Sequence, residues 1–391
     1  MSAYDVIVLG LGAMGSAAAQ RLAASGARVL GLEQYTAAHD RGSSHGGSRM
    51  IRFTLYREQA YVRLLARAHE LWRRLERDSG ADVLAITGGL AMGAPDHSVI
   101  AGGMRSAEEA GVAYEILDAA EIRRRFPPFA PEPGMIGVYE PSAGFLRPEA
   151  AVRAYLDQAA ARGADLRFGE PALRWEAQPS GDGVRVVTQA GTYEASRLVL
   201  TPGPWAGGEA ASLDLPLTVA RVVMFWFDPP GGTEPFVPDR FPVFVCLPEG
   251  GERFYGFPAH EGPRGGVKLA FSLRMSPCTP DTIDPAVHEV EIALMKEHLA
   301  RCVPALNGRC IAARTCMYTN TPDLHFVIGP HPAVPQCVVA CGFSGHGFKF
   351  ASVVGEILAD LAMEGQTRHE IALFAPTRFR EARRPVPVPY V

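Results

Sequence analysis

The chain has 391 residues, of which 47% are apolar and 20% charged, and its formal net charge is −4. A length and composition of this kind are ordinary for a globular protein with two domains. The slight negative charge argues against a basic nucleic-acid-binding protein, and no apolar run reaches the roughly 18 residues that span a membrane.

The N-terminal residues enter an apolar run at once, without a basic segment or a cleavage site, so we expect a protein that is not secreted. The seven cysteines include no pair with the two-residue gap of a zinc knuckle or redox motif. We therefore expect a cytoplasmic protein with reduced thiols and no bound metal. Most of these cysteines are interpreted as small buried apolar residues.

Residues 5–33 predict a strand, a glycine turn, a helix and a second strand. The first strand covers residues 5–9, the helix residues 16–25, and the second strand residues 28–33. In such a turn the first glycine permits the bend, the second admits a pyrophosphate, and the third lets the helix pack closely. Glu33 lies 18 residues beyond Gly15, near the usual spacing of about 20 for a carboxylate that binds a ribose. The segment predicts an adenine dinucleotide site formed by Gly10, Gly12, Ala13, Met14, Gly15 and Glu33.

The rest of the chain alternates between helical and strand patterns. Residues 36–49 form a long polar loop, which favours a ligand-binding role. A second strand runs into a glycine turn at residues 201–205, an arrangement that often closes a flavin site. Residues 215–275 predict an antiparallel sheet over the site, and residues 383–391 an extended arm. Predicted helices cover residues 61–80, 99–110, 149–162, 288–301 and 350–363; predicted strands cover 87–93, 112–117, 165–188 (with a hairpin turn at 181–183), 191–201, 222–227, 241–247, 253–257, 267–273 and 338–341.

Both ends of the chain are expected to build the dinucleotide-binding part. We predict a discontinuous cofactor domain of residues 1–80, 145–215 and 315–391. Residues 81–144 and 216–314 then form the substrate domain. NAD and FAD are both compatible with the glycine turn alone. The C-terminal glycine-rich turn, which would return to the cofactor, favours FAD.

Three segments carry a family resemblance: Gly42–Arg52 (GSSHGGSRMIR), Cys316–Asp323 (CMYTNTPD) and Gly342–Phe350 (GFSGHGFKF). In this order, and over nearly the whole chain, the sequence resembles the monomeric sarcosine oxidase and N-methyltryptophan oxidase family. The resemblance implies an α/β fold with a Rossmann-like FAD domain of the p-hydroxybenzoate hydroxylase type. The second domain would hold a mixed, largely antiparallel sheet. It further implies oxidation of the C–N bond of a secondary amino acid to an imine, with O2 reduced to H2O2.

The resemblance also implies roles for individual residues. Cys316 would carry FAD as a covalent thioether, and Arg52 and Lys349 would hold the substrate carboxylate. Arg49 would lie near the flavin ring, and Lys268 where oxygen is activated. His346 would act as a base or, as we favour, position flavin and substrate through its glycine turn. Tyr255 and Tyr318 would form walls of the substrate pocket. Arg49 and Lys349 would also contact the cofactor. The remaining cofactor contacts would be Ser43, Ser44, His45, Gly203, Trp205, Gly342, Gly345, Gly347 and Phe348.

The chain departs from the family pattern near the expected substrate. Phe53–Glu58 stands where the family has His-Ala-Tyr-Gly-Glu, and Ser272 where the sarcosine enzyme has a pocket histidine. The substrate is therefore left open among sarcosine, pipecolate, proline and N-methyl aromatic amino acids. Alternatives of another kind are a non-catalytic flavin-binding protein and an NAD(P)-dependent imine reductase. We expect a monomer whose only partners are a small secondary amino acid and O2.

Overall fold

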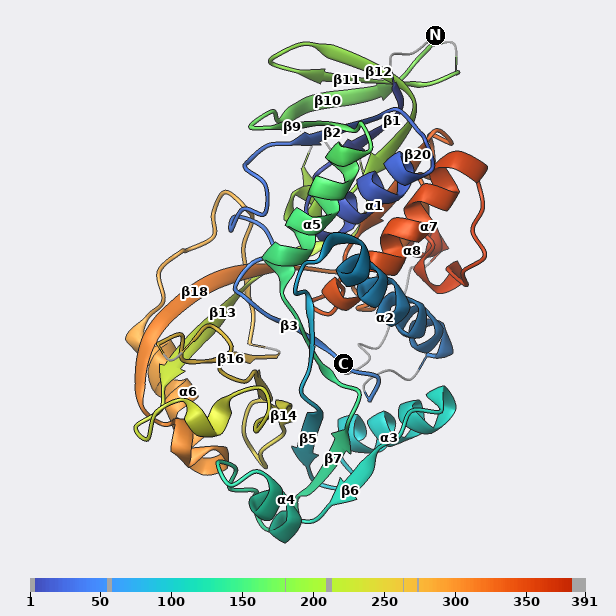
Figure 1. Cartoon of the computed structure of the whole chain (residues 1–391). Coiled ribbons are helices and arrows are strands. Elements are labelled where there is room, and N and C mark those ends of the chain that lie inside the picture. Colours follow the sequence, from blue (N-terminus) through green and yellow to red (C-terminus); the bar gives the residue numbers. More distant parts are fainter. Residues whose placement is uncertain are drawn as a thin grey trace.

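Two large β-sheets lie toward opposite ends of the molecule (Figure 1). The computed structural model describes residues 4–54, 58–179, 181–208, 213–262, 264–272 and 274–381. The sequence positions predicted as an extended C-terminal arm, 383–391, and residues 55–57 of the divergent segment after Arg52 lie outside the described residues. Within the described residues, no helix combines the length and apolarity needed to cross a bilayer.

The first sheet is the predicted dinucleotide-binding sheet. Its strands run in the order β10-β11-β12-β1-β2-β9, and β20 joins both β12 and β19. The pairs that join β1, β2, β9, β12 and β20 are parallel. The largely apolar, buried runs of β1, β2 and β20 agree with this pairing, whereas β9 at the edge of the sheet is only partly buried. The bounds are β1 (Tyr4–Leu9), β2 (Val29–Glu33), β9 (Asp165–Phe168), β10 (Ala172–Ala177), β11 (Val184–Thr188), β12 (Thr192–Leu200), β19 (Val327–Pro330) and β20 (Cys337–Cys341).

Helices from three distant parts of the chain gather beside this sheet. Helix α1 packs against both α5 and α7, and α2 packs against α7 (Figure 1). The first sheet is therefore supported by segments from the N-terminal, middle and C-terminal parts of the chain. The helices are α1 (Ala13–Ala24), α2 (Gln59–Ser79), α3 (Ser98–Ala110), α4 (Ala119–Arg125), α5 (Pro148–Ala161), α6 (Glu289–Cys302), α7 (Ala351–Glu364) and α8 (Arg378–Glu381).

The second sheet lies with α3, α4 and α6 in the other half of the molecule (Figure 1). Its order is β17-β13-β16-β15-β14-β5-β7-β6, with β18 along β13. Only the β5–β14 pair of its described pairings is parallel, so the sheet is mixed and largely antiparallel, as predicted. The strands are β5 (Gly89–Gly93), β6 (Glu115–Leu117), β7 (Ile136–Glu140), β13 (Thr218–Asp228), β14 (Val243–Cys246), β15 (Phe254–Gly256), β16 (Val267–Phe271), β17 (Ser276–Pro277) and β18 (Arg309–Asn320).

A small sheet connects the two halves. Its order is β3 (Arg49–Ile51), β8 (Gly144–Leu146) and β4 (Leu84–Ile86), with both pairs antiparallel. The strand β3 directly follows the polar loop of residues 36–48. Arg49 is therefore the first residue of β3, at the end of the loop, and Arg52 directly follows the last residue of β3.

Several element boundaries differ from the sequence prediction: the strand predicted at 165–188 is divided into β9, β10 and β11, for example, and packing explains two other differences. Helix α1 begins at Ala13 rather than residue 16, because Gly15 allows the first helical turn to sit directly on the β1 turn: a Cβ there would overlap the Gly10 carbonyl oxygen. The predicted strand at 112–117 is shorter, since Gly111 and Val112 close the end of α3 and β6 begins only at Glu115.

Candidate active site and cofactor cavity

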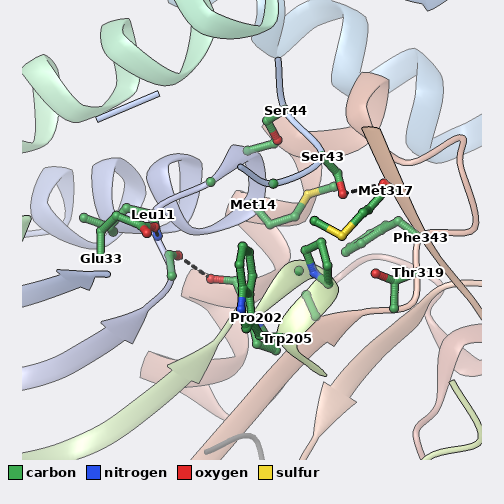
Figure 2. Close-up of a pocket in the computed structure, with 18 of the residues that line it drawn as sticks. Leu11, Met14, Glu33, Ser43, Ser44, Pro202, Trp205, Met317, Thr319 and Phe343 are labelled. Atoms are coloured by element: carbon green, nitrogen blue, oxygen red, sulfur yellow. Dashed lines mark hydrogen bonds between the residues drawn. The ribbon is translucent and has the colours of Figure 1, made fainter. Parts of the chain in front are cut away.

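A cavity of about 350 Å³ opens at the carboxyl ends of the parallel strands β1, β2 and β12. This edge of an α/β sheet is where ligands usually bind. The C-terminal segment around Gly342 completes the wall, as predicted from the glycine-rich turn there. Figure 2 shows Glu33 and Leu11 at one end of this cavity and Thr319 and Phe343 at the other. We call it the cofactor cavity.

The three glycines of the first turn have different surroundings. A Cβ at Gly10, where φ is +84°, would meet the Thr201 carbonyl oxygen, and one at Gly15 would overlap the Gly10 carbonyl oxygen. A Cβ at Gly12 would have a single neighbour within 4 Å, the Ser44 hydroxyl at 3.9 Å. Gly10 and Gly15 are thus required by packing, while Gly12 faces open space in the cavity wall. Gly12 also precedes α1 without a side-chain cap, so unpaired N–H groups of the helix are available to an anion such as a pyrophosphate.

Glu33 ends β2 at the far end of the cavity. Its carboxylate accepts hydrogen bonds from the N–H groups of Leu11 at 2.9 Å and Tyr35 at 3.0 Å, and His39 lies 3.4 Å away. Burial by itself would raise the pKa of Glu33, but the bonds from His39 and Leu11 outweigh it and lower the pKa. The carboxylate is therefore ionised at neutral pH and suited to accept hydrogen bonds from a sugar hydroxyl.

Most of the predicted cofactor contacts line this cavity. Gly15 and His45 do not: Gly15 packs α1 on the sheet, and His45 is buried beside Arg49 and Lys268. Cys316 and Lys349 line the neighbouring cavity instead. The predicted residues that do line the cofactor cavity are Gly10, Gly12, Ala13, Met14, Glu33, Ser43, Ser44, Arg49, Gly203, Trp205, Gly342, Gly345, Gly347 and Phe348.

A second cavity, of about 140 Å³, lies between the small sheet, the second sheet and the C-terminal glycine turn. We call it the substrate cavity. It shares five lining residues with the cofactor cavity, so the two cavities meet there. The shared residues are Arg49, Tyr318, Ser344, Gly345 and Phe348. All five predicted substrate contacts line the substrate cavity, namely Arg52, Tyr255, Ser272, Tyr318 and Lys349.

Two of these lining residues are deeply buried cations. Arg52 and Lys349 are each 6% exposed. Burial and the neighbouring Arg52 lower the pKa of Lys349 to about 7, although Glu140 opposes the shift. The ammonium is thus poorly stabilised by the protein alone, and a bound carboxylate would favour it.

Glu140 was not predicted from the sequence and fixes the chain next to Arg52. It is fully buried at the end of β7. Its carboxylate accepts hydrogen bonds from the backbone N–H groups of Phe53 at 3.0 Å and Thr54 at 2.9 Å. It therefore orients the residues that directly follow Arg52. A glutamate that ends a strand carries no distinctive sequence signal.

The thiol of Cys316 lies in the wall of the substrate cavity next to the junction with the cofactor cavity. Strand β18 places Cys316 opposite Val222 of β13, and the side chain is 3% exposed. The guanidinium of Arg49 lies 3.8 Å from the sulfur and donates hydrogen bonds to the carbonyls of Ser43 and Ser48, both at 2.8 Å. Arg49 is thereby fixed where the two cavities meet.

Lys268 is buried behind the Gly46–Ser48 turn and lines neither of these two cavities. Its ammonium donates hydrogen bonds to the carbonyls of Gly46 at 2.7 Å and Ser48 at 2.9 Å, and lies 5.0 Å from the Phe257 ring centre. Burial, and then Arg49, lower its pKa well below the usual value, although the nearby Glu149 and Glu261 oppose the shift. The structure thus holds Lys268 near Arg49 and Cys316, one layer behind the cavity wall.

His346 lines the substrate cavity from the C-terminal glycine turn. Burial, and then Lys349, lower its pKa to about 3, so the ring is neutral at physiological pH. Its Nε2 lies 3.1 Å from the Leu324 carbonyl oxygen, which can only accept, so this nitrogen carries the hydrogen. Its ring also packs on Phe326, with centres 4.7 Å apart. These contacts favour the positioning role over that of a base.

The two predicted tyrosines meet across the substrate cavity. Their hydroxyl oxygens, on β15 and β18, lie 3.3 Å apart. Arg253, which lies two residues before Tyr255, also lines this cavity and was not predicted. Side chains alternate between the two faces of a strand, so residues 253 and 255 lie on one face. Because Tyr255 was predicted to line the cavity, this alternation could have indicated Arg253 as a second lining residue.

Comparisons with known proteins agree with this arrangement. A family model described as FAD dependent oxidoreductase matches residues 5–361. The monomeric sarcosine oxidase of Streptomyces avermitilis is 51% identical over 380 residues, which cover 97% of this chain and 98% of the relative. The N-methyl-L-tryptophan oxidase of Salmonella arizonae is 32% identical, with 97% and 100% covered. The solved structure of NikD, described as an unusual amino acid oxidase essential for nikkomycin biosynthesis, superposes with a TM-score of 0.83 at 27% identity, covering 96% of this chain and 98% of that one.

The family model covers both sheets, and the relatives match almost end to end. The fold prediction of a two-domain α/β flavoprotein is confirmed by these likenesses. The chain therefore belongs to the FAD-dependent oxidoreductase family that includes monomeric sarcosine oxidase and N-methyl-L-tryptophan oxidase, and it is an FAD-dependent enzyme.

Proposed function

We propose that this enzyme oxidises secondary amino acids, N-methylated or cyclic, at the carbon–nitrogen bond and delivers the electrons to O2. The substrate loses two electrons and two protons to become an imine, water then hydrolyses the imine, and O2 becomes H2O2. The observation that carries the proposal is the junction of the cofactor cavity with a cation-lined substrate cavity. The names of the sarcosine and N-methyltryptophan oxidases support it, and membership in an FAD-dependent family favours it over an NAD(P)-dependent imine reductase.

FAD would fit the cofactor cavity through the groups described above. The N-terminus of α1 and Gly12 suit its pyrophosphate, and Glu33 suits a ribose hydroxyl. Bound FAD supplies the two-electron acceptor that no protein side chain provides. Arg49, at the meeting point of the cavities, would stabilise negative charge on a reduced cofactor.

The substrate carboxylate would bind between Arg52 and Lys349. A guanidinium binds a carboxylate with two parallel hydrogen bonds, and the ammonium adds a third charged donor. Fixing the acid group holds the carbon–nitrogen bond in one orientation toward the cofactor cavity. The uncharged His346 and the Tyr255–Tyr318 pair would shape the cavity around the rest of the molecule.

The covalent link would join the Cys316 sulfur to the 8α carbon of the flavin. The thiol and the methyl group together lose two electrons and two protons, and one O2 takes them up as H2O2, so the reaction balances. The burial of Cys316 at the cavity junction and the adjacent Arg49 support this assignment. The guanidinium would stabilise negative charge on the sulfur during bond formation.

Lys268 would serve the reduction of oxygen. Its buried ammonium is held by two carbonyls and has no direct carboxylate partner among the described residues, so its charge is available to a developing oxygen anion. The lowered pKa also makes Lys268 a group that can release a proton. This role stays separate from substrate binding, since Lys268 lines neither the substrate nor the cofactor cavity.

We also propose the domain division and the setting of the enzyme. The cofactor domain comprises residues 1–80, 145–215 and 315–391, which include most of the cofactor-cavity wall, and the remaining residues form the substrate domain. All seven cysteines lie within the described residues and are free, which supports a reducing compartment such as the cytoplasm. The name of the relative in Streptomyces supports a monomer, which sedimentation analysis would test.

A substrate panel tests the proposed reaction. Sarcosine, N-methylated amino acids, proline and pipecolate are mixed with the enzyme without oxygen, and bleaching of the flavin absorbance is recorded. We expect at least one of them to bleach the flavin and, with oxygen, to yield one H2O2 for each substrate consumed. A flavoprotein that no secondary amino acid bleaches would instead support a non-catalytic flavin-binding protein.

A further inference from the structure

We propose that Arg253 binds a second anionic group on the substrate, so that the enzyme prefers secondary amino acids that carry a side-chain carboxylate. This inference rests on the proposed oxidation of secondary amino acids in the same cavity, and it narrows their chemical class. Its basis is the position of Arg253, the absence of an ion-pair partner for it in the described part of the chain, and the charge of the surrounding wall.

The position of Arg253 follows from the ladder between β15 and β16. The N–H of Ser272 donates to the Arg253 carbonyl at 2.9 Å, directly beyond the paired residues Phe254 and Phe271. Phe254 is fully buried in the aromatic core on one face of the sheet. The alternation along the strand then directs Arg253 and Tyr255 to the opposite face, where both line the substrate cavity together with Ser272.

Among the described residues, Arg253 has no counter-ion. Its Nε atom is buried without a hydrogen-bond partner, and no ion pair joins its guanidinium to a carboxylate in the described part of the chain. Other partly buried arginines are paired: Arg221 lies 2.7 Å from Glu291, and Arg378 lies 2.8 Å from Asp323. Because a desolvated charge is costly when it is unpaired, an unpaired arginine in a cavity wall indicates that its partner is a ligand.

The charge on Arg253 persists at neutral pH. Burial, and then the nearby Arg52, lower its pKa to about 10, while Tyr318 and Tyr255 oppose the shift. The guanidinium is therefore still protonated under physiological conditions. Its mutual repulsion with Arg52 means that an anion between or beside the two would relieve an unfavourable interaction.

The charge balance of the cavity wall points to more than one substrate carboxylate. The described residues that line the cavity include four cations, Arg49, Arg52, Arg253 and Lys349, and neither Asp nor Glu. Arg49 is engaged by two backbone carbonyls and lies against Cys316, and Arg52 with Lys349 suffices for one α-carboxylate. A monocarboxylate would leave Arg253 unpaired. A dicarboxylate would neutralise it, and the small Ser272 beside it leaves room and offers a hydroxyl donor.

The test compares two substrates of nearly equal size, N-methyl-L-glutamate and its uncharged analogue N-methyl-L-glutamine. We expect the ratio of their kcat/KM values to favour the acid by roughly 10- to 100-fold, the range for a hydrogen bond to a charged group. In Arg253→Met the ratio falls to about one, and Arg253→Lys, which keeps the charge, retains part of the preference. Arg274→Met is the matched control, since Arg274 is an exposed arginine nearby that pairs with Glu252 outside the cavity.

Binding without turnover separates this inference from the proposed function. Dissociation constants are read from the flavin absorbance for glutarate and its monoamide, two acids of matched size that lack the oxidisable amine and can therefore only bind. Equal affinities in the wild type, or a preference that survives in Arg253→Met, would overturn the inference while sarcosine oxidation stands. A preference for glutarate in binding, with no oxidation of any secondary amino acid, would support the anion site and refute the proposed reaction. A variant that does not retain flavin is replaced by Arg253→Gln, for which the same loss of preference is expected.

Discussion

The guanidinium of Arg49 lies 3.8 Å from the sulfur of Cys316, although 267 residues separate the two along the chain. Arg49 begins the short strand β3, whereas Cys316 lies in the long strand β18 of the other sheet. The contact therefore forms where a loop from the cofactor cavity meets the floor of the substrate cavity. The proposed attachment of the flavin depends on this meeting.

Replacing Cys316 should release the flavin. In Cys316→Ala no thioether can form, so we expect FAD to separate from the protein on acid denaturation, whereas it stays with the wild-type chain. The intact mass of the wild type should exceed that of the apoprotein by one FAD. Cys310→Ala, a change in the same strand, is the control and should keep the attached flavin. A wild-type enzyme that is active at its apoprotein mass would contradict the assignment.

Loss of Arg52 should weaken the binding of acids. In Arg52→Met we expect kcat/KM to fall by the equivalent of about 2–5 kcal/mol, because the substrate carboxylate loses a desolvated charged partner. The KM should change more than the rate of bleaching at saturation. Arg63→Met, which removes an exposed arginine from α2, should have no effect. The measurement is steady-state kinetics with the acid and with its methyl ester. If the ester reacts as fast as the acid, Arg52 and Lys349 do not bind the substrate carboxylate.

The binding of simple carboxylates should depend on the protonation of Lys349. Its pKa is lowered to about 7, so the ammonium is present below this pH and is lost above it. The dissociation constant of acetate, followed by the flavin absorbance, should therefore rise above pH 7 by up to about tenfold per pH unit. Over this range His346, with a pKa of about 3, stays neutral, and Arg253, with a pKa of about 10, stays largely charged.

The variant Lys349→Met provides the check on that dependence. It should bind acetate weakly and with little change between pH 6 and pH 8.5, since the titrating ammonium is gone. A pH dependence that survives this substitution would assign the titration to another group.

Lys268 should affect the oxidative half-reaction far more than the reductive one. In Lys268→Met we expect the reaction with oxygen to slow by about 10²–10³-fold, the loss typical for one preorganised electrostatic donor. Bleaching by the amino acid under anaerobic conditions should be much less affected. Lys296→Met, on the exposed side of α6, is the control. Stopped-flow measurements of both half-reactions are needed; equal slowing of both would assign Lys268 a general structural role.

The dinucleotide-binding segment was predictable because its constraints are local. The glycines that α1 and β1 require are close in the sequence, and the apolar runs of β1 and β2 are continuous. The start of α1 at Ala13 was missed, because glycines normally disfavour a helix and only the tight packing of Gly15 on Gly10 explains it.

The long strand β18 was not predicted as a strand. Its burial alternates irregularly and its first half is partly exposed, since β13 is the only strand of the described residues that pairs with it. Its motif residues were identified through the family resemblance, not through periodicity. Glu140 and Arg253 were missed for a related reason: each becomes informative only when strands far apart in the sequence are paired.

The burial of Lys268 and Lys349 has a practical consequence for chemical modification. Lysine occurs only three times in the sequence, and these two are 3% and 6% exposed. Lys296, the third, is exposed on α6, which lines neither the cofactor nor the substrate cavity. An amine-reactive reagent applied to the folded enzyme should therefore attach at one side chain, besides the chain's amino terminus. Coupling through Lys296 would immobilise the enzyme on an electrode or bead in a largely uniform orientation, with both cavities left uncovered.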